Sequence, residues 1–492
     1  MGWRGDVRQS LLDRRPASTF ALLLWMASSG GAAASDGDRT FGSPNGSTEV
    51  CRSLERIPGG VYSAADEEEE ERLCSIDWYD GATAVCPKTA STSPGAMVFV
   101  LVEDASAEEF ERESCRAGAP AQAVFKTTMN EVDTSGTFSP ASLLYYHFSR
   151  YFDTDVGVPP AVYRTVDRRV YGSRVVAKAG GGSSMNVAAW RRLKAAVADP
   201  STYKPTSELF TEDRTLMYGV LLHHDLKRFG DEVNGAYVPG EDRIPAFQRT
   251  APFLALASPG PLDDAIAAGL LQARKDPRMA AALVPAPDDG QMRAWMVEVS
   301  EIVLLDFIFE QQDRVGNIDY RWEWMPPEQD GPVVPVPDQY SKFPRSRMAE
   351  IPRPEGPQYA EHVLRQHAVI GDNDAGGRTQ YVNVTRKAGM LKRLRHLRPV
   401  TYTRLMELGD DFEADGKLLA YLRDQFHLSS SQVSNIATNA IDARNILREA
   451  CLAGTLILDL EPDGDAACAV PVSAPLPAGP RRALDPDPGS AR

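Results

Sequence analysis

The sequence predicts an α+β fold in which a sheet-rich first part is followed by a mainly helical second part. Short apolar runs rich in β-branched residues indicate strands between residues 96 and 205, whereas apolar residues at helical spacing dominate from 206 to 455. Because strands and helices are grouped and do not alternate, the pattern argues against a parallel βαβ series. The 492 residues suffice for two or three domains with a sizeable core.

Residues 1–34 have the composition of a secretory signal peptide. Four arginines precede a short apolar core at 20–26, and three alanines at 32–34 offer a cleavage pattern. The apolar core is shorter than the roughly 20 residues that a transmembrane helix needs. We therefore expect an exported protein: in the lumen of the secretory pathway (Golgi-like) or secreted, and periplasmic or extracellular if the source is bacterial. Whether the signal is cleaved or retained stays open.

Residues 35–95 are expected to form a loop-rich extension that contains cysteines. In an oxidising compartment, an even set of cysteines predicts up to three disulfides, whose pairing the sequence leaves open. The acidic run at 66–71 is expected to be a solvated face. Asn45 and Asn383 lie in acceptor patterns for N-glycosylation, which predicts a glycoprotein if the compartment glycosylates. The six cysteines are Cys51, Cys74, Cys86, Cys115, Cys451 and Cys468.

The segment 96–205 shows four strand-like runs and one helix. The runs at 96–103, 121–128, 158–166 and 173–179 are apolar and β-branched, as strands are. The helix is expected over 139–152, with Ser139 and Pro140 suited to its first turn.

The segment 206–455 is expected to be helical, most clearly over 209–229, 294–312 and 397–450. Residues 326–357 contain so many prolines that they predict an inserted loop. The last part, 456–492, is rich in proline and alanine and is expected to be a largely disordered tail.

The charge balance excludes some partners. With 53 Lys and Arg against 68 Asp and Glu, the formal net charge is −15. Such acidity argues against an unaided nucleic-acid binder or a binder of anionic membranes. No segment after the signal reaches transmembrane length, so no stable membrane span is expected.

Asp313 and Asn317 follow the long apolar helix, in the turn QDRVGNI at 312–318. A carboxylate and a carboxamide held on such a turn can accept a hydroxyl proton and bind Mg²⁺, respectively, as phosphoryl transfer requires. The alternative is that both side chains only cap a turn.

Two further segments carry suitable chemistry. Asp372 and Asp374 follow an apolar run in HAVIGDNDAGGR at 367–378, and carboxylates at a tight turn suit a hard cation. Lys126 ends the strand-like run that contains VFK, from which a lysine can reach nucleotide phosphates. A rival, Lys178, stands in VVAK before three glycines.

Taken in order, these segments resemble the atypical kinase group that includes the secretory-pathway Golgi casein kinase family, HipA-type bacterial kinases and phosphoinositide kinases. The residues that carry the resemblance are VFK at 124–126, VGVPPAVYR at 156–164, LLDFIFEQQDRVGNI at 304–318 and IGDNDAG at 370–376. The resemblance covers about 96–450. It implies a bilobal protein-kinase-like fold, with an N-lobe at 96–205 and a C-lobe at 206–455, that uses ATP and Mg²⁺ or Mn²⁺.

The resemblance also implies roles for single residues. Lys126 would bind nucleotide phosphates, Asp313 would be the catalytic aspartate, and Asp372 or Asp374 would hold the metal. Glu131 is the nearest candidate to pair with Lys126. The chain departs from the group in having Val315 where a histidine is usual, in having its amide four residues after the aspartate instead of five, and in lacking a glycine-rich loop.

We therefore expect an exported phosphotransferase that moves the γ-phosphate of ATP to a hydroxyl of a secreted protein or glycan. The departures favour an alternative, a catalytically inactive pseudokinase that binds nucleotide or acts as an allosteric partner of an active kinase. Transfer of an adenylyl group is a third possibility, and an exported structural protein with coincidental polar turns is a fourth.

Overall fold

The structure is a computed structural model that describes residues 38–88, 93–101, 106–113, 115, 121–131, 134, 136–180, 184–223, 227–238, 240, 243–327, 333–376, 383–461 and 468. The signal peptide expected at 1–34 lies outside these ranges, as does most of the tail expected at 456–492.

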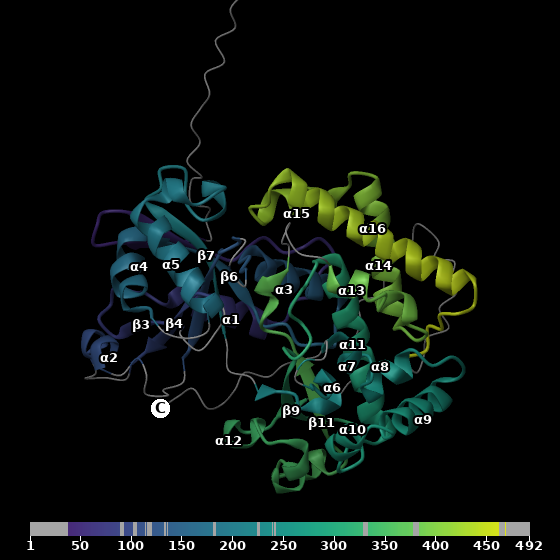
Figure 1. Cartoon of the computed structure of the whole chain (residues 1–492). Helices are drawn as coiled ribbons and strands as arrows, with labels where there is room; N and C mark the ends of the chain where they lie inside the picture. The colour runs from purple at the N-terminus through teal and green to yellow at the C-terminus, as the bar shows by residue number, and fades with distance from the viewer. Residues whose placement is uncertain are drawn as a thin grey trace, which may run out of the picture. The chain divides into compact units, whose positions relative to one another are not determined.

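The first part of the chain builds a seven-stranded antiparallel sheet (Figure 1), with the strand order β1-β2-β6-β7-β5-β4-β3. The strands expected at 96–103, 121–128 and 158–166 are confirmed as β4, β5 and β6. The bounds are β1 Arg39–Gly42, β2 Thr48–Arg52, β3 Thr83–Pro87, β4 Gly95–Val100, β5 Ala123–Thr127, β6 Ala161–Asp167 and β7 Leu216–Leu222.

Phe125 and Lys126 show how the two faces of this sheet differ, because successive side chains of a strand point to opposite sides. The Phe125 ring packs against Trp78 and Tyr171, with ring centroids 5.4 Å and 5.7 Å apart. That face is covered by α4 (Arg168–Arg174) and α5 (Ser184–Ala198). Lys126 points to the other face, where the helix expected at 139–152 is confirmed as α3 (Pro140–Phe152).

The prediction of a helix over 209–229 is wrong, because this segment supplies the central strand β7 and the short strand β8 (Lys227–Arg228). Gly219, in the middle of β7, lies against the ring of Phe125. A Cβ at position 219 would approach that ring to 2.2 Å, so only glycine fits there.

The prediction of a strand over 173–179 is also wrong. The segment contains the end of α4 and a 3₁₀ turn, Val176–Lys178. Asp167 caps α4, since its carboxylate accepts the backbone N–H groups of Arg169 and Val170 at 2.8 Å and 3.1 Å. The cap starts α4, which ends just before Val175, and Val176 begins the 3₁₀ turn.

The loop-rich prediction for 35–95 is wrong for about half of the residues described there, which form β1, β2, α1 (Ala64–Ser75) and β3. The acidic run at 66–71 lies in α1 and is not only a solvated face. Asp66 and Glu70 are buried, and they pair with Arg150 and Arg56 at 2.6 Å and 2.7 Å.

Three disulfides confirm the prediction of up to three and resolve its open pairing. They join Cys51 to Cys74, Cys86 to Cys115 and Cys451 to Cys468. The first ties β2 to α1, and the second ties the end of β3 to the segment that follows α2 (Ala107–Glu113). These bridges fit an oxidising compartment.

The second part is mainly helical, as predicted, and the helix expected at 294–312 is confirmed as α11 (Asp289–Ile308). Side chains of α11 are buried all along its length in the larger core, which α3 and the last helices share (Figure 1). The remaining helices are α6 Asp231–Asn234, α7 Arg243–Phe247, α8 Ala251–Leu256, α9 Leu262–Ala273, α10 Pro277–Ala282, α13 Val384–Lys387, α14 Pro399–Glu413, α15 Lys417–Gln425 and α16 Ser430–Leu452.

A small second sheet follows α11. Strands β9 (Asp319–Met325) and β11 (Val363–Val369) pair antiparallel, and β8 and β10 (Val334–Pro335) also pair with β9. The proline-rich insertion predicted at 326–357 lies between β9 and β11. Besides β10, it includes α12 (Asp338–Ser341) and the 3₁₀ turn Arg345–Glu350.

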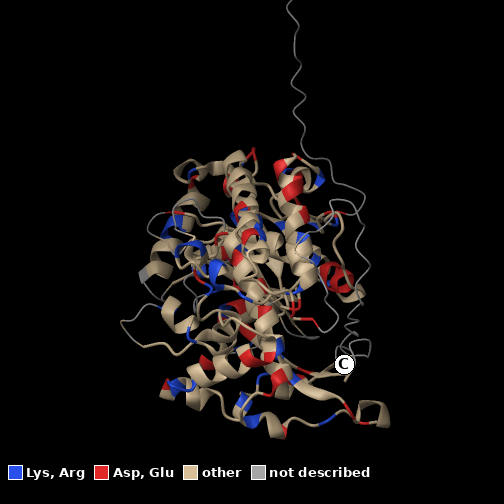
Figure 2. Cartoon of the chain, turned by 90° about the vertical axis from the view of Figure 1, so that its right-hand side faces the viewer, with Lys and Arg blue, Asp and Glu red and all other residues tan. Residues whose placement is uncertain are grey.

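In the part of the chain that the structure describes, no helix is long and apolar enough to cross a membrane. Basic and acidic residues, blue and red on the ribbon of Figure 2, are interspersed among one another along the chain.

Candidate active site

Lys126 lies against the turn that carries Asp372 and Asp374, which we call the aspartate turn. Lys126 and Asp372 are 246 positions apart in the sequence. Its Nζ is 3.0 Å from Oδ1 of Asp372 and also makes a short ion pair with Oδ1 of Asp374. The Lys126 side chain is only 3% exposed. These two carboxylates hold the pKa of Lys126 above its usual range, against the opposing effect of burial. Lys126 is therefore a buried, fully charged lysine that is paired with the predicted metal ligands.

The position of the aspartate turn follows from strand pairing. Strand β11 ends at Val369, and Val369 pairs with Asp319 at the start of β9. Asp372 then begins the 3₁₀ turn Asn373–Ala375. The backbone N–H of Phe138, just before α3, donates to the carbonyl of Asp374 at 2.6 Å. The turn is thus fixed between the small sheet and the start of α3.

Asp313 and Asn317 stand on the turn that leaves α11. Gly316 has φ +87° there, a conformation that glycine adopts without strain. Arg228 of β8 connects this turn with the other aspartates. Its guanidinium donates to Oδ1 of Asn317, and its Nη2 is 2.7 Å from Oδ2 of Asp372. The structure therefore brings Lys126, Asp313, Asn317, Asp372 and Asp374 into one region.

Gln311 holds the backbones of both predicted aspartates. Its Oε1 accepts the N–H of Asp313 at 3.0 Å, and its Nε2 donates to the carbonyl of Asp372 at 3.1 Å. Gln311 is 1% exposed, so water does not compete for these bonds. The sequence reasoning did not single out this residue, although it stands two positions before Asp313.

Arg314 forms a second link between the two turns. Its Nε is 3.1 Å from Oδ2 of Asp306 on α11, and its Nη2 donates to Oδ1 of Asn373 at 2.6 Å. Tyr145 of α3 also donates to Asp306, at 2.7 Å. Since Arg314 and Asp306 are both buried, the hydrogen bonds of this network fix the side chains between Asp313 and Asp372.

Asp319 is a buried site residue that the sequence reasoning missed. It is 2% exposed, and its carboxylate makes no hydrogen bond or ion pair with any residue that the structure describes. Burial raises the pKa of Asp319 to about 6, and the charge of Asp372 adds to that effect, whereas Arg228 opposes it. The sequence did contain a signal, because Asp319 is the first residue of a strand rich in aromatic residues. An unpaired charge at such a buried position is unfavourable.

Lys88 is a second missed residue. It directly follows β3 and is half-buried. Burial lowers the pKa of Lys88, and so does the positive charge of Lys126, whereas Asp372 and Asp374 raise it. Its ammonium group therefore lies close enough to the site for these charges to act on it. The sequence reasoning overlooked Lys88 because it belongs to the segment expected to be a loop-rich extension.

The two other predicted nucleotide-binding residues have different partners. The carboxylate of Glu131 is 3.1 Å from Nε of Arg192 on α5, and the ion pairs of Lys126 within the described chain are with the two aspartates instead. Lys178 pairs with Glu111 at 2.7 Å. The 3₁₀ turn of Lys178 packs on the sheet face opposite to Lys126.

Asp313 has the exposure and electrostatics of a group that can meet a substrate. Its side chain is exposed, yet the surrounding protein still raises the pKa of Asp313 by desolvation, while Arg243 lowers it. A carboxyl group whose pKa is raised is a better proton acceptor. Arg243 is placed by a hydrogen bond from its Nη1 to the carbonyl of Val315, at 3.5 Å.

The oxygen donors match the chemistry of Mg²⁺ or Mn²⁺, which take carboxylate and amide oxygens. In the described part of the chain, however, no group of three or more His, Cys, Asp or Glu side chains is gathered closely enough to hold a metal ion. Lys126 and Arg228 neutralise the predicted ligands instead.

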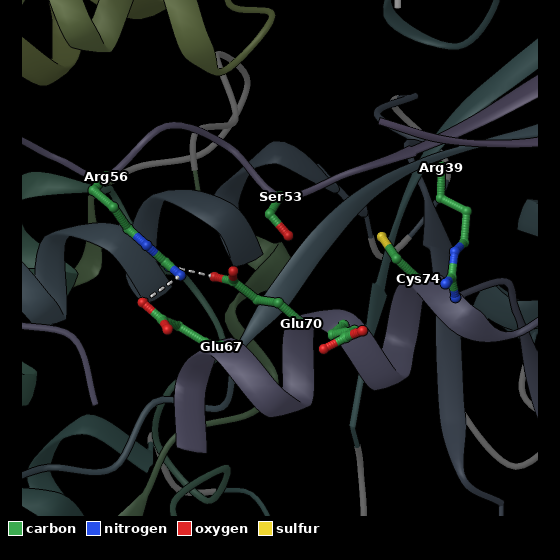
Figure 3. Close-up of a pocket in the computed structure, with 7 residues that line it drawn as sticks. Arg39, Ser53, Arg56, Glu67, Glu70 and Cys74 are labelled. Carbon is green, nitrogen blue, oxygen red and sulfur yellow. Dashed lines mark hydrogen bonds and ion pairs between the residues drawn. The ribbon is translucent and has the colours of Figure 1, made fainter. Parts of the chain in front are cut away.

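A separate pocket of about 390 Å³ lies beside α1 and contains none of the predicted site residues. Figure 3 shows Arg56 directed between Glu67 and Glu70, with which it forms ion pairs at 3.6 Å and 2.7 Å. Three of the charged residues that line this pocket, Arg56, Glu67 and Glu70, therefore pair with one another.

Comparisons with known proteins match this chain to solved structures. No protein-family model matches the sequence, and no curated protein matches it. The structure of hydra Fam20 with sugar aligns over 83% of this chain and 96% of its own, at 13% identity and a TM-score of 0.41. The Golgi casein kinase aligns over 76% of each chain, at 12% identity and a TM-score of 0.36. The second of these gives its name to the family that the sequence resembles.

Proposed function

We propose that the chain is an ATP-dependent phosphotransferase that acts on a hydroxyl of a secreted protein or glycan. The observation that carries the proposal is the convergence of Lys126 with Asp372 and Asp374, and of this cluster with the turn of Asp313. A buried strand lysine, two aspartates after a strand and an exposed aspartate with a raised pKa are the groups that phosphoryl transfer uses. Their positions far apart in the sequence make a chance meeting a poor explanation.

In the proposed reaction, an acceptor hydroxyl attacks the γ-phosphorus of ATP. The new bond joins the acceptor oxygen to phosphorus, and the bond between that phosphorus and the β–γ bridging oxygen breaks. Asp313 takes the hydroxyl proton, and ADP leaves. Lys126 binds the phosphate oxygens. Gln311 and Arg314 fix the position of Asp313 relative to the aspartate turn.

A divalent cation would be held by Asp372 and Asp374, with Asp319 and the amide oxygen of Asn317 as further donors. Because the described acidic side chains are not gathered closely enough to hold a metal ion, Lys126 and Arg228 would have to release Asp372 and Asp374 for the cation to bind. When bound, it would neutralise charge on the phosphates. Asp319 replaces Asn317 as the better ligand in this proposal, because its carboxylate has no partner among the described residues, whereas the Asn317 amide is held by Arg228.

The compartment proposed for this reaction is the lumen of the secretory pathway or the space outside the cell. The three disulfides support it. Glycosylation at the two acceptor patterns receives less support. The Asn383 amide nitrogen donates to the carbonyl of Phe307 at 2.7 Å, and that of Asn45 donates to Asp167 at 3.0 Å. Neither nitrogen is free in the folded chain.

The test is a transfer assay with γ-labelled ATP and Mn²⁺ or Mg²⁺, using casein-type proteins and glycan acceptors. Asp313→Asn is expected to lower the rate by at least about a hundredfold, the range lost with a catalytic base, and to leave ATP binding intact. Asp264→Asn, at an exposed position on α9, is the matched control and should be as active as the wild type. Equal activity of Asp313→Asn and wild type would exclude the proposed role.

A pseudokinase is the second candidate, and one observation favours it. Arg228 holds both Asn317 and Asp372, and Lys126 holds Asp372 and Asp374. A site whose carboxylates already have internal cations can bind nucleotide without metal. ATP binding that survives a chelator, with no transfer of phosphate or AMP, would select this function over catalysis.

A further inference from the structure

Lys88, Gly95 and Lys126 form a row across three neighbouring strands. Pro87 at the end of β3 pairs with Ala96 of β4, and the next step of the same register brings Lys88 opposite Gly95. The N–H of Lys88 donates to the carbonyl of Gly95 at 2.9 Å. Gly95 in turn pairs with Lys126 of β5. Directly opposed residues share one face of a sheet, so both lysines stand on the face of the site.

The glycine between them leaves room for the Lys88 side chain. A Cβ at position 95 would be 4.0 Å from Cδ of Lys88, which shows that the lysine stem extends over the glycine. The charges that act on the Lys88 ammonium include Lys126, Asp372, Asp374 and Arg228. The stem therefore carries a positive charge from the edge strand toward the aspartate turn.

The two lysines differ in how their charge is balanced. Lys126 has two carboxylate partners, whereas the Lys88 ammonium makes no ion pair and no side-chain hydrogen bond with any residue that the structure describes. A half-buried cation without an anion is unfavourable unless a ligand supplies one. Strands lie about 4.8 Å apart, so the two lysine backbones are about 10 Å apart across the glycine.

We propose that Lys88 and Lys126 together bind a polyphosphate chain, with Lys88 supplying the unpaired charge. Linked phosphates carry several charged oxygens along a chain, so one polyphosphate can contact two lysines whose backbones are about 10 Å apart. The identification of this polyphosphate as the phosphate chain of a nucleotide rests on the proposed function. The Lys88 site itself does not require that the phosphate be transferred.

The experiment measures binding of inorganic tripolyphosphate and of ATP to the full chain by calorimetry, in the presence of Mg²⁺. The variants are Lys88→Met, which keeps the length of the stem, and Lys88→Arg, which keeps the charge. Lys275→Met is the matched control, because Lys275 is an exposed lysine that follows α9 and whose ammonium group donates to Gln272 near the end of that helix. The thermal midpoint of each variant shows whether it is folded.

For Lys88→Met we expect tripolyphosphate and ATP to bind about tenfold more weakly, the factor that corresponds to one charge-assisted hydrogen bond. Lys88→Arg should bind within about twofold of the wild type, since the charge remains. Wild-type affinity in a folded Lys88→Met would overturn the inference and leave the proposed function standing. Weakened binding by Lys88→Met in a chain that transfers no phosphate would support the inference and contradict the proposed function. Absence of binding to the wild type would overturn both.

Discussion

Arg314 shows how a single side chain couples the two halves of the candidate site. It contacts Asp306 on the buried helix α11 and Asn373, which lies between Asp372 and Asp374 in the aspartate turn. Because Arg314 directly follows Asp313, any shift of one turn is passed to the other. The sequence placed Arg314 beside a candidate catalytic residue but could not show its partners, since Asn373 is 59 positions away.

The buried carboxylate of Asp319 lowers the free energy of unfolding, and replacing it with a neutral residue should show by how much. Burial raises the pKa of this carboxyl group to about 6, so the folded state disfavours the ionised form above that pH. In an unfolded chain the same group titrates near pH 4, and the cost therefore grows as the pH rises from about 4 to 6 and stays constant above.

We therefore predict that Asp319→Asn raises the free energy of unfolding by about 1 kcal/mol or more at pH 8, and that this gain disappears below about pH 4. The same variant should bind Mn²⁺ and ATP more weakly, because a metal donor is lost. Denaturant titrations at the two pH values, together with calorimetry, measure both effects. A variant that is less stable than wild type at pH 8 would show that Asp319 is a structural and not a functional charge.

The residues of the site that could be read from the sequence are those that follow recognisable elements. Lys126 ends an apolar strand, Asp313 follows an apolar helix, and Asp372 follows another strand. Lys88 and Arg228 could not be found in this way, because only pairing in the two sheets brings β3 and β8 to the site. Strand register across such distances is a tertiary property that local patterns do not contain.

At the scale of elements, the strand β7 explains the largest error of the sequence analysis. Its residues LMYGVLL are apolar on both faces, since the strand is central and covered on both sides. A buried strand and a buried helix cannot be distinguished by periodicity over so short a run. The glycine in its middle was the usable sign, because glycine weakens a helix and marks close approach in a strand.

Helix α3 contains a buried histidine that should make the fold sensitive to acid. His147 is fully buried, and its Nδ1 is 2.6 Å from the hydroxyl of Tyr62. Burial lowers the pKa of His147 to about 3, and the charges of Arg56 and Arg150 act in the same direction. In the unfolded chain the imidazole of His147 is protonated below about pH 6.5, whereas in the folded chain it stays neutral at that pH. The free energy of unfolding therefore decreases as the pH falls below about 6.5.

We predict that His147 alone costs the wild type about 1 kcal/mol of unfolding free energy between pH 7 and pH 5.5. His147→Gln can still hydrogen-bond to Tyr62 and does not titrate, so its pH dependence should be flatter by that amount. Denaturant titrations of both proteins at the two pH values give the comparison. If the two proteins lose the same stability, His147 does not act as the acid-sensitive group.

At the scale of the whole molecule, the site is assembled from the edge hairpin of the large sheet, the strand β5 beside that hairpin, the turn after α11 and the turn after β11. The net charge of −15 gives no hint of this region, where Lys88, Lys126, Arg228 and Arg243 gather around the aspartates. Four basic side chains beside these aspartates supply local positive charge that an anionic ligand can contact in an otherwise acidic chain. The fold class could be predicted because strands precede helices, but the convergence could be seen only in the folded chain.

The central claim is that Lys126 and the aspartate turn form one site for a nucleotide and a metal ion. Its most direct test is calorimetric titration of ATP, with and without Mn²⁺, into the wild type and into Lys126→Met, with circular dichroism to confirm that both are folded. We predict binding to the wild type that Mn²⁺ strengthens, and a loss of at least about tenfold in Lys126→Met, since a buried charged partner of the phosphates is removed. Equal affinity of the two folded proteins for ATP, or no binding by the wild type, would contradict the claim.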